Sequence, residues 1–225
     1  MARLPRLVLA GQPHLVIQRA LVRHAAFADA EDRARLFDVL REALAAERVQ
    51  LHAYALRSDE LRLLVTPPEV RSLARLMQAI GRRYVVAYNR RHGRSGTLWD
   101  GRFRAAAVEP GEPLLGAMVW VEQTDDASAA TSAAHHLGKL RDVIVTDPPA
   151  YWRLGNTPFE REAVWRERLA HGLSAADALR LRRAALGGWA IGSPAFVAAA
   201  AASGRPAEPR PRGRPRRAQA TPRQA

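Results

Sequence analysis

The order in which the apolar repeats change along the first half of the chain is the strongest constraint on its fold. Residues 13–22 are rich in β-branched and apolar side chains and follow a turn signal, which predicts a strand. Apolar residues at helical spacing then predict a helix near residues 30–49. Two further strands, 49–56 and 61–67, are separated only by the polar residues 57–60, so we expect them to form a hairpin.

The pattern then continues with a helix, a strand and a further helix. Residues 70–92 carry an i, i+3/i+4 apolar stripe that stops at glycines, residues 98–110 read as a strand, and residues 112–123 read as a helix with a proline in its first turn. This order is that of the split β-α-β, or ferredoxin-like, sandwich. We therefore expect an α+β fold, with residues 1–125 forming the principal domain.

The remainder of the chain is expected to divide into a helical extension and a tail. Helical patterns return near residues 158–170, 174–186 and 193–202, so residues 126–204 are assigned to a C-terminal helical extension. Residues 205–225 contain seven arginines, five prolines and one acid, a composition that cannot form a core. The sequence therefore predicts a disordered basic tail.

The charge of the chain is strongly positive and unevenly distributed. The formal net charge is +13, and nine arginines against the single acid Asp100 lie between residues 70 and 104. Such a concentration predicts a surface that binds a polyanion. Cysteine is absent, which excludes disulfides, thiolate metal sites and cysteine nucleophiles. No apolar run is long enough for a membrane span or signal peptide, so we expect a cytoplasmic, nucleoid-associated protein with no membrane partner.

The type of residue in this cluster favours DNA as the polyanion. Arginine contacts phosphates and guanine bidentately, and aromatic rings can stack on unpaired bases. Tyr84 and Tyr88 have two readings, as core residues of the helix or as part of the DNA surface. The DNA-binding residues predicted here are Arg82, Arg83, Arg90, Arg91, Arg94, Trp99, Arg102 and Arg104.

The tail adds a second candidate DNA contact. Residues 211–215 read Pro-Arg-Gly-Arg-Pro, which is similar to the core of an AT-hook. In such a motif, Arg212 and Arg214 would enter the narrow minor groove of A·T-rich duplex while Gly213 lets the backbone approach its floor. The plain alternative is a nonspecific electrostatic arm.

Several segments together resemble the REP-associated tyrosine transposases, small single-strand DNA transposases of the HUH type related to the IS200 elements. The resemblance rests on residues 4–19, 52–56, 63–67, 77–104 and 187–197. The longest and most specific of these is the block from MQAIGRRY to GTLWDGRFR. The resemblance implies a DNA-binding protein of transposition that recognises hairpins at repeated palindromes, in which two histidines and a polar residue hold Mg²⁺ or Mn²⁺ and a tyrosine attacks the phosphorus.

The chain departs from that family at each catalytic position. The two histidines correspond to Glu60 and Arg62, the tyrosine to Trp120, and the polar metal ligand to Thr124. Arginine is always protonated and cannot bind a metal, and tryptophan has no nucleophilic atom for this reaction. We therefore expect no cofactor or metal site, and we expect the guanidinium of Arg62 to contact a phosphate in place of the metal.

Three hypotheses remain at this stage. The first is a monomeric DNA-binding protein that recognises single-stranded or hairpin DNA and has lost strand cleavage. The second is an active metal-dependent nuclease in which Tyr84 or Tyr88 attacks and Glu60 with Asp59 binds the metal. The third is a gene remnant that folds poorly. The adjacent His135 and His136 fall in an expected loop and give no useful spacing for a metal site.

Overall fold

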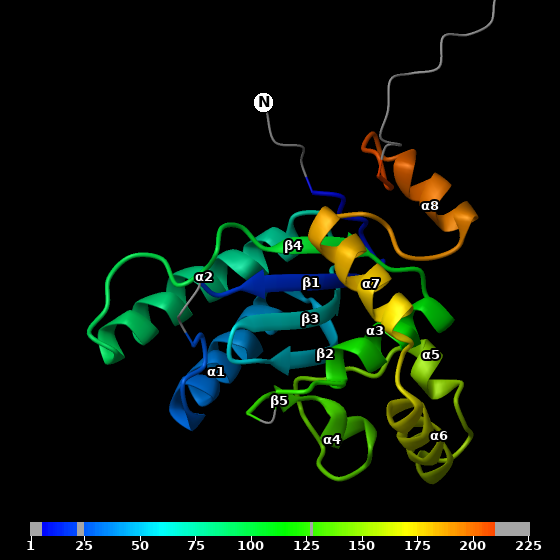
Figure 1. The fold of residues 1–225 in the computed structure, drawn as a ribbon, viewed down its shortest axis with the longest axis horizontal. Coiled ribbons are helices and arrows are strands. Elements are labelled where there is room, and N and C mark those ends of the chain that lie inside the picture. The colour runs from blue at the N-terminus through cyan, green and yellow to red at the C-terminus, as the bar shows by residue number, and fades with distance from the viewer. Residues whose placement is uncertain (1–5, 22–24, 127, 210–225) are drawn as a thin grey trace, which may run out of the picture.

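A computed structural model describes residues 6–21, 25–126 and 128–209 of the 225-residue chain. Its centre is a five-stranded antiparallel sheet with the strand order β4-β1-β3-β2-β5 (Figure 1). The order of the first four strands is that expected for a ferredoxin-like sandwich. The α+β fold class predicted from the sequence is therefore confirmed.

The strands of the sheet are short and closely follow the apolar segments of the sequence. They are β1 (His14–Arg19), β2 (Gln50–Leu56), β3 (Glu60–Thr66), β4 (Arg104–Ala107) and β5 (Ala130–Thr131). In the central pair, Arg19 of β1 lies opposite Glu60 of β3, and Ile17 lies opposite Arg62. Since side chains alternate between the two faces of a sheet, Glu60, Arg62 and Leu64 share one face, and Leu61, Leu63 and Val65 share the other.

Two long helices cover the face that carries Leu61, Leu63 and Val65. These are α1 (Ala30–Glu47) and α2 (Ser72–Arg91), which pack against each other as well as against the sheet. The side chain of Asp29 caps α1 by accepting the amide of Asp32. On α2 the apolar stripe predicted from the sequence is buried, and it includes Leu73, Leu76, Ile80, Tyr84 and Tyr88.

The opposite face of the sheet is covered by α3 (Glu112–Glu122) and by parts of the C-terminal extension. The extension contains α4 (Ala133–His136), α5 (Pro149–Trp152), α6 (Pro158–His171), α7 (Ala175–Gly187) and α8 (Pro194–Ala201). Trp165 of α6 and Leu181 of α7 share one apolar core with α3 and the sheet. The extension therefore completes this layer, and its last part, with α8, forms a small separate apolar cluster with Leu7. Figure 1 shows α7 beside the sheet and α8 farther from it.

The strand expected over residues 98–110 is shorter in the structure than predicted. Only Arg104–Ala107 pair continuously with β1, while Trp99 forms an isolated bridge to Ala20. Gly101, between these two stretches, adopts a positive φ of 70°, which lets the chain turn out of the sheet. The interruption leaves Arg102 and Arg104 beside the edge of the sheet.

The structure also moves the start of the predicted tail. Residues 205–209 are packed, because the amide of Ala190 donates to the carbonyl of Ala207 and the Ala207 side chain is buried with Leu7 and Ala200. The sequence assigned these residues to a disordered segment on composition alone. Among the described residues, no helix is long and apolar enough to span a membrane.

Candidate nucleic-acid interface

Three residues that the family resemblance aligns with catalytic positions form one compact, buried group between β3 and α3. Nε of Arg62 donates to Oε1 of Glu60 at 2.7 Å, and Nη1 of Arg62 donates to the carbonyl of Trp120 at 3.3 Å. The guanidinium also lies over the Trp120 ring, 4.0 Å from its centroid. Each of these three residues is less than a tenth exposed. They therefore pair with one another within the fold through Oε1 of Glu60, while its Oε2 forms no hydrogen bond to any described residue.

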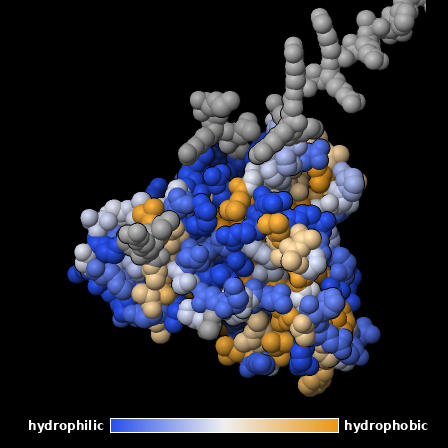
Figure 2. Space-filling view, viewed as in Figure 1, coloured by the Kyte–Doolittle hydropathy of each residue, from blue (hydrophilic) through white to orange (hydrophobic). Residues whose placement is uncertain are grey.

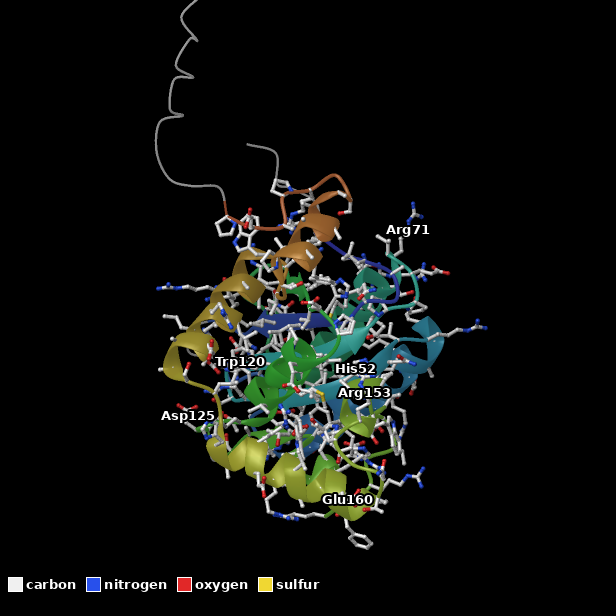
Figure 3. All side chains as sticks on the ribbon, turned by 90° about the vertical axis from the view of Figure 1, so that its right-hand side faces the viewer. His52, Arg71, Trp120, Asp125, Arg153 and Glu160 are labelled. Atoms are coloured by element: carbon white, nitrogen blue, oxygen red, sulfur yellow. The ribbon has the colours of Figure 1, made fainter. Side chains whose placement is uncertain are left out.

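Two further arginines border this group. Nη1 of Arg182, on α7, lies 3.2 Å from the same Oε1 of Glu60. Nη1 of Arg57 donates to Oγ1 of Thr124 at 2.5 Å and to Asp125 at 2.9 Å. Figure 3 shows Trp120 and Asp125 on the same side of the molecule. The hydroxyl of Thr124 is thus bound to Arg57, and it also accepts the amide of Asp126 at 3.1 Å.

The structure corrects the expected role of Arg62. The sequence predicted that its guanidinium is free to bind a phosphate in place of a metal. Instead, Glu60 neutralises it, and the Trp120 ring covers one face of it. Burial lowers the pKa of Arg62, and the hydrogen bond that Arg62 donates to Glu60 opposes this effect. Arg62 therefore supports the internal packing of this group and does not offer its charge to a ligand.

The arginines of α2 divide into those with an acidic partner and those without. Arg91 is bound by three acids at the start of α1, Asp29, Glu31 and Asp32, and Arg83 pairs with Glu42 of α1. Within the described residues, Arg82, Arg90 and Arg94 form no ion pair. Arg82 and Arg90 are exposed, so they are the stronger candidates on this helix for contact with a polyanion.

The aromatic residues near these arginines belong to the core. Tyr84 and Trp99 are at most 7% exposed and pack against Phe27. The hydroxyls of Tyr84 and Tyr88 donate to the backbone carbonyls of Ala26 and Ala25. Burial raises the pKa of both phenols, which disfavours the phenolate. The expectation that Trp99 stacks on bases is therefore wrong for this conformation, because its ring is covered.

Tyr84 and Tyr88 also lie on the wrong face for the displaced-tyrosine mechanism. They belong to the layer that packs on Leu61 and Leu63, whereas Glu60 faces α3 across the sheet. Asp59, the other metal ligand in that hypothesis, is exposed in the hairpin turn, 3.9 Å from Nε of Arg57. The geometry therefore provides no route by which either phenol meets a metal at Glu60.

A second basic site is a pocket of about 200 Å³. It lies beside β4, the end of β1 and the end of α7. Its charged lining consists of Arg6, Arg19, Arg102, Arg104 and Arg205 against one acid, Asp100. We call it the arginine pocket. Asp100 is bound to Arg19 at 2.6 Å, so the other four guanidinium groups have no acidic partner within the described parts of the chain. Hydrophilic residues cover much of the surface around β4 in Figure 2.

The arginines of this pocket are held close together despite their charge. Nε of Arg6 donates to the carbonyl of Phe103, and its guanidinium lies 3.6 Å from the centroid of the Phe103 ring. Burial, together with repulsion from Arg102 and Arg104, lowers the pKa of Arg6 to about 10. Gly188 has φ of +70°, and a Cβ there would lie 2.9 Å from Arg205. Uncompensated guanidinium groups around a small pocket form a site suited to a phosphate.

Comparison with solved structures identifies the architecture. One structure, a REP-associated tyrosine transposase bound to a REP hairpin, aligns with 67% of this chain and 96% of its own, at a TM-score of 0.52 and 13% sequence identity. This chain has the fold of a REP-associated tyrosine transposase. A candidate transposase from Deinococcus radiodurans R1 aligns over 48% of this chain and 88% of its own at 23% identity, but its TM-score of 0.37 carries no weight. No protein-family profile and no curated protein sequence matches the chain.

The transposase fold supports the resemblance seen in the sequence, and it locates the predicted residues on different surfaces. Glu60, Arg62 and Trp120 come together as the resemblance implies. The arginine cluster at residues 71–104 does not form one surface, because α2 lies in one helical layer whereas Arg102 and Arg104 line the arginine pocket. Arg71, at the start of α2, projects far from Trp120 (Figure 3). Arg212 and Arg214 lie outside the described residues.

Sequence reasoning missed two groups of residues. Arg6 and Arg205 come from opposite ends of the chain, so their approach to Arg102 required the fold. His135 and His136, which the sequence dismissed as adjacent loop residues, converge with Asp147. A pair of neighbouring histidines followed by an aspartate eleven residues later was the only signal available. By contrast, His14 and His52 are hydrogen-bonded residues of the buried sheet.

Proposed function

We propose that this protein binds hairpin or single-stranded DNA on a transposase fold and has lost the ability to cleave it. The observation that carries the proposal is the packed group of Glu60, Arg62 and Trp120. These side chains stand where the family resemblance expects two metal-binding histidines and the attacking tyrosine. They occupy that space with a salt bridge and a stacked ring.

The chemistry of this group leaves no means of cleavage at the former centre. Strand transfer requires a nucleophile that forms a covalent bond to phosphorus and a cation that stabilises the charge on the phosphoryl oxygens. Trp120 supplies no nucleophilic atom, and Oε1 of Glu60, the one anionic side chain, is already bound by Arg62 and Arg182. The guanidinium of Arg62 fills the position of the cation but faces inward, so it cannot act on a bound phosphate.

The arginine pocket is the best candidate for the DNA contact on the same side of the sheet. Arg19 lines it and also lies opposite Glu60 across the β1–β3 pair, while Arg182 contacts Glu60 from α7. Arg19 and Arg182 therefore place the arginine pocket on the face of the sheet that carries Glu60 and Arg62. A nucleic-acid backbone bound by the unpaired arginines of the pocket would pass near Glu60 and Arg62.

Binding of a fluorescent hairpin with a single-stranded flank tests this assignment. We expect the double variant Arg102→Gln/Arg104→Gln to weaken binding and to flatten the dependence of log K on log salt. Each lost phosphate contact should reduce the slope by about 0.7 for single strands. The matched control is Arg82→Gln/Arg90→Gln, which removes the same charge from α2. Equal losses in both variants would refute the pocket as the principal contact, and failure of the unmodified protein to bind would refute the proposed function itself.

The remaining partners are part of the same proposal. Arg212 and Arg214 would add contacts to A·T-rich duplex, as their AT-hook-like setting suggests. The protein would act as a monomer in the cytoplasm, on the nucleoid. The hairpin recorded with the solved transposase supports a hairpin as the first ligand to test.

A further inference from the structure

A buried cluster of histidines and carboxylates lies apart from the former catalytic centre, beside α3 and α4. It contains His135, His136 and Asp147, and one ligand atom from each of these residues lies within 4.8 Å of the others. Oδ1 of Asp147 is 3.2 Å from Nε2 of His135 and 3.4 Å from Nε2 of His136. These separations match the edge of a tetrahedron of N and O ligands around zinc, which is about 3.3 Å for bonds of about 2.0 Å.

One ring nitrogen of the cluster has no hydrogen-bond partner. His136 is fully buried, and its Nε2 points into the cluster without forming a hydrogen bond to any described residue. Its other nitrogen, Nδ1, is 2.5 Å from Oε1 of Glu122. Although Nε2 lies 3.4 Å from Oδ1 of Asp147, a buried nitrogen that forms no hydrogen bond is costly in the absence of a ligand. A metal ion at Nε2 would satisfy it.

Glu122 is itself held in place by the surrounding core. Its Oε1 accepts the hydroxyl of Ser132 at 2.6 Å, and its Oε2 accepts the indole N–H of Trp165 at 2.9 Å. A carboxylate that fixes the far nitrogen of a histidine is the usual support of a metal-ligating imidazole. The support for His136 is therefore already built into α3 and α6.

The electrostatic environment also suits a cation. Carboxylate oxygens of Glu122 and Asp147 lie 2.5 Å and 3.4 Å from the two ring nitrogens of His136. The same two carboxylates would balance the charge of a divalent ion. His135 and Asp147 are each between a tenth and a fifth exposed, so the cluster opens towards solvent on that side.

We propose that His135, His136 and Asp147 bind one divalent transition-metal ion of the zinc type. Two imidazoles and a carboxylate form a borderline donor set that favours such ions over magnesium or calcium. Three protein ligands leave a fourth position for water. The ion would join α4 to the segment that precedes α5, at a place separate from Glu60 and Arg62.

Metal binding requires one local rearrangement. The amide of Asp142 donates to Nδ1 of His135 at 3.0 Å, which places the proton of a neutral ring on Nε2. A metal bound at Nε2 moves that proton to Nδ1, so the Asp142 amide must turn away. Asp142 lies in a loop between α4 and α5, where such a turn of one peptide disturbs no helix or strand.

Metal titration of the full chain tests the proposal without reference to DNA. The protein is stripped with a chelator and desalted, and then titrated with Co²⁺ while its visible absorption is recorded. We expect the spectrum of a tetrahedral site, saturation at one ion per chain, displacement by Zn²⁺, and a higher melting temperature with Zn²⁺. Asp147→Asn and His135→Gln should each weaken binding by at least tenfold, whereas His171→Gln, an exposed histidine of α6, should bind as the unmodified protein does.

Two results would overturn the assignment. The first is a stripped protein that retains no zinc after gel filtration and melts at the same temperature with and without it. The second is unchanged affinity in both cluster variants, which would place the bound ion elsewhere. Circular dichroism of each variant establishes that it is folded before the titration is interpreted.

Discussion

Replacing Arg62 should expose the energetic coupling within the former catalytic centre. In Arg62→Met, a side chain of similar length keeps the contact with Trp120 but leaves Glu60 buried with only Arg182 as a charged partner. Removing one member of a buried ion pair costs about 3–5 kcal/mol. Because Arg182 remains 3.2 Å from Glu60, we expect the lower end, about 3 kcal/mol.

The double variant Glu60→Gln/Arg62→Met should recover most of this loss. It removes both charges from the interior, so no carboxylate is left without its partner, and its cost should be about 1 kcal/mol or less. For a chain of this size, 1 kcal/mol corresponds to about 2–4 °C in melting temperature. Arg62→Met should therefore melt about 6–12 °C below the unmodified protein, and the double variant should melt within about 4 °C of it.

Thermal and urea unfolding at pH 7 and moderate salt measure both variants. A matched control is Arg41→Met, which removes an arginine from an exposed pair with Asp38 and should cost well under 1 kcal/mol. Equal destabilisation by the single and the double variant would show that Glu60 and Arg62 are not coupled. That result would refute the view that the substituted residues replace the metal centre as one packed group.

Three further predictions concern the tyrosines, the buried histidines and the tail. Tyr84→Phe should lower the free energy of unfolding in urea by about 1–2 kcal/mol, because the Ala26 carbonyl loses its buried donor. The variant should bind DNA with unchanged affinity, and a loss of affinity would show that Tyr84 contributes to DNA binding. Burial lowers the pKa of His14 to about 4, so as the pH falls the unfolded chain takes up a proton on this residue before the folded protein does. The free energy of unfolding should therefore decrease between about pH 6.5 and pH 4. Urea unfolding at several pH values should show a smaller decrease for His14→Gln. Removing residues 210–225 should leave the melting temperature unchanged and weaken binding to A·T-rich duplex more than to G·C-rich duplex; equal losses would make the tail a nonspecific arm.

The sequence predicted the sheet and its helices because their apolar repeats are long and regular. The helix at residues 112–123, for example, differs from α3 by one residue. The strand at 98–110 was overestimated because the positive φ of Gly101, which interrupts it, is set by the turn and not by the apolar pattern. The short elements α4 and α5 were missed since four-residue helices carry too little periodicity to recognise.

The sequence predicted which residues lie together at the candidate site, but it did not predict the contacts that they form. The family resemblance brought Glu60, Arg62 and Trp120 to one place, yet only the structure shows that Arg62 faces Glu60 and not a ligand. The density of arginines along the chain did not predict which of them are available to bind DNA. Arg91 is neutralised by acids at the start of α1, whereas Arg104 has no acidic partner among the described residues. Which arginines remain available depends on contacts between distant segments.

Gel analysis of the unmodified protein with an end-labelled hairpin, in the presence of Mg²⁺ or Mn²⁺, tests the central claim most directly. A native gel reports binding, and a denaturing gel of the same samples reports cleaved strands and covalent protein–DNA adducts. The account predicts a retarded complex that persists with a chelator and yields no cleaved or covalent product. Metal-dependent nicking, or an adduct abolished by Tyr84→Phe or Tyr88→Phe, would contradict it.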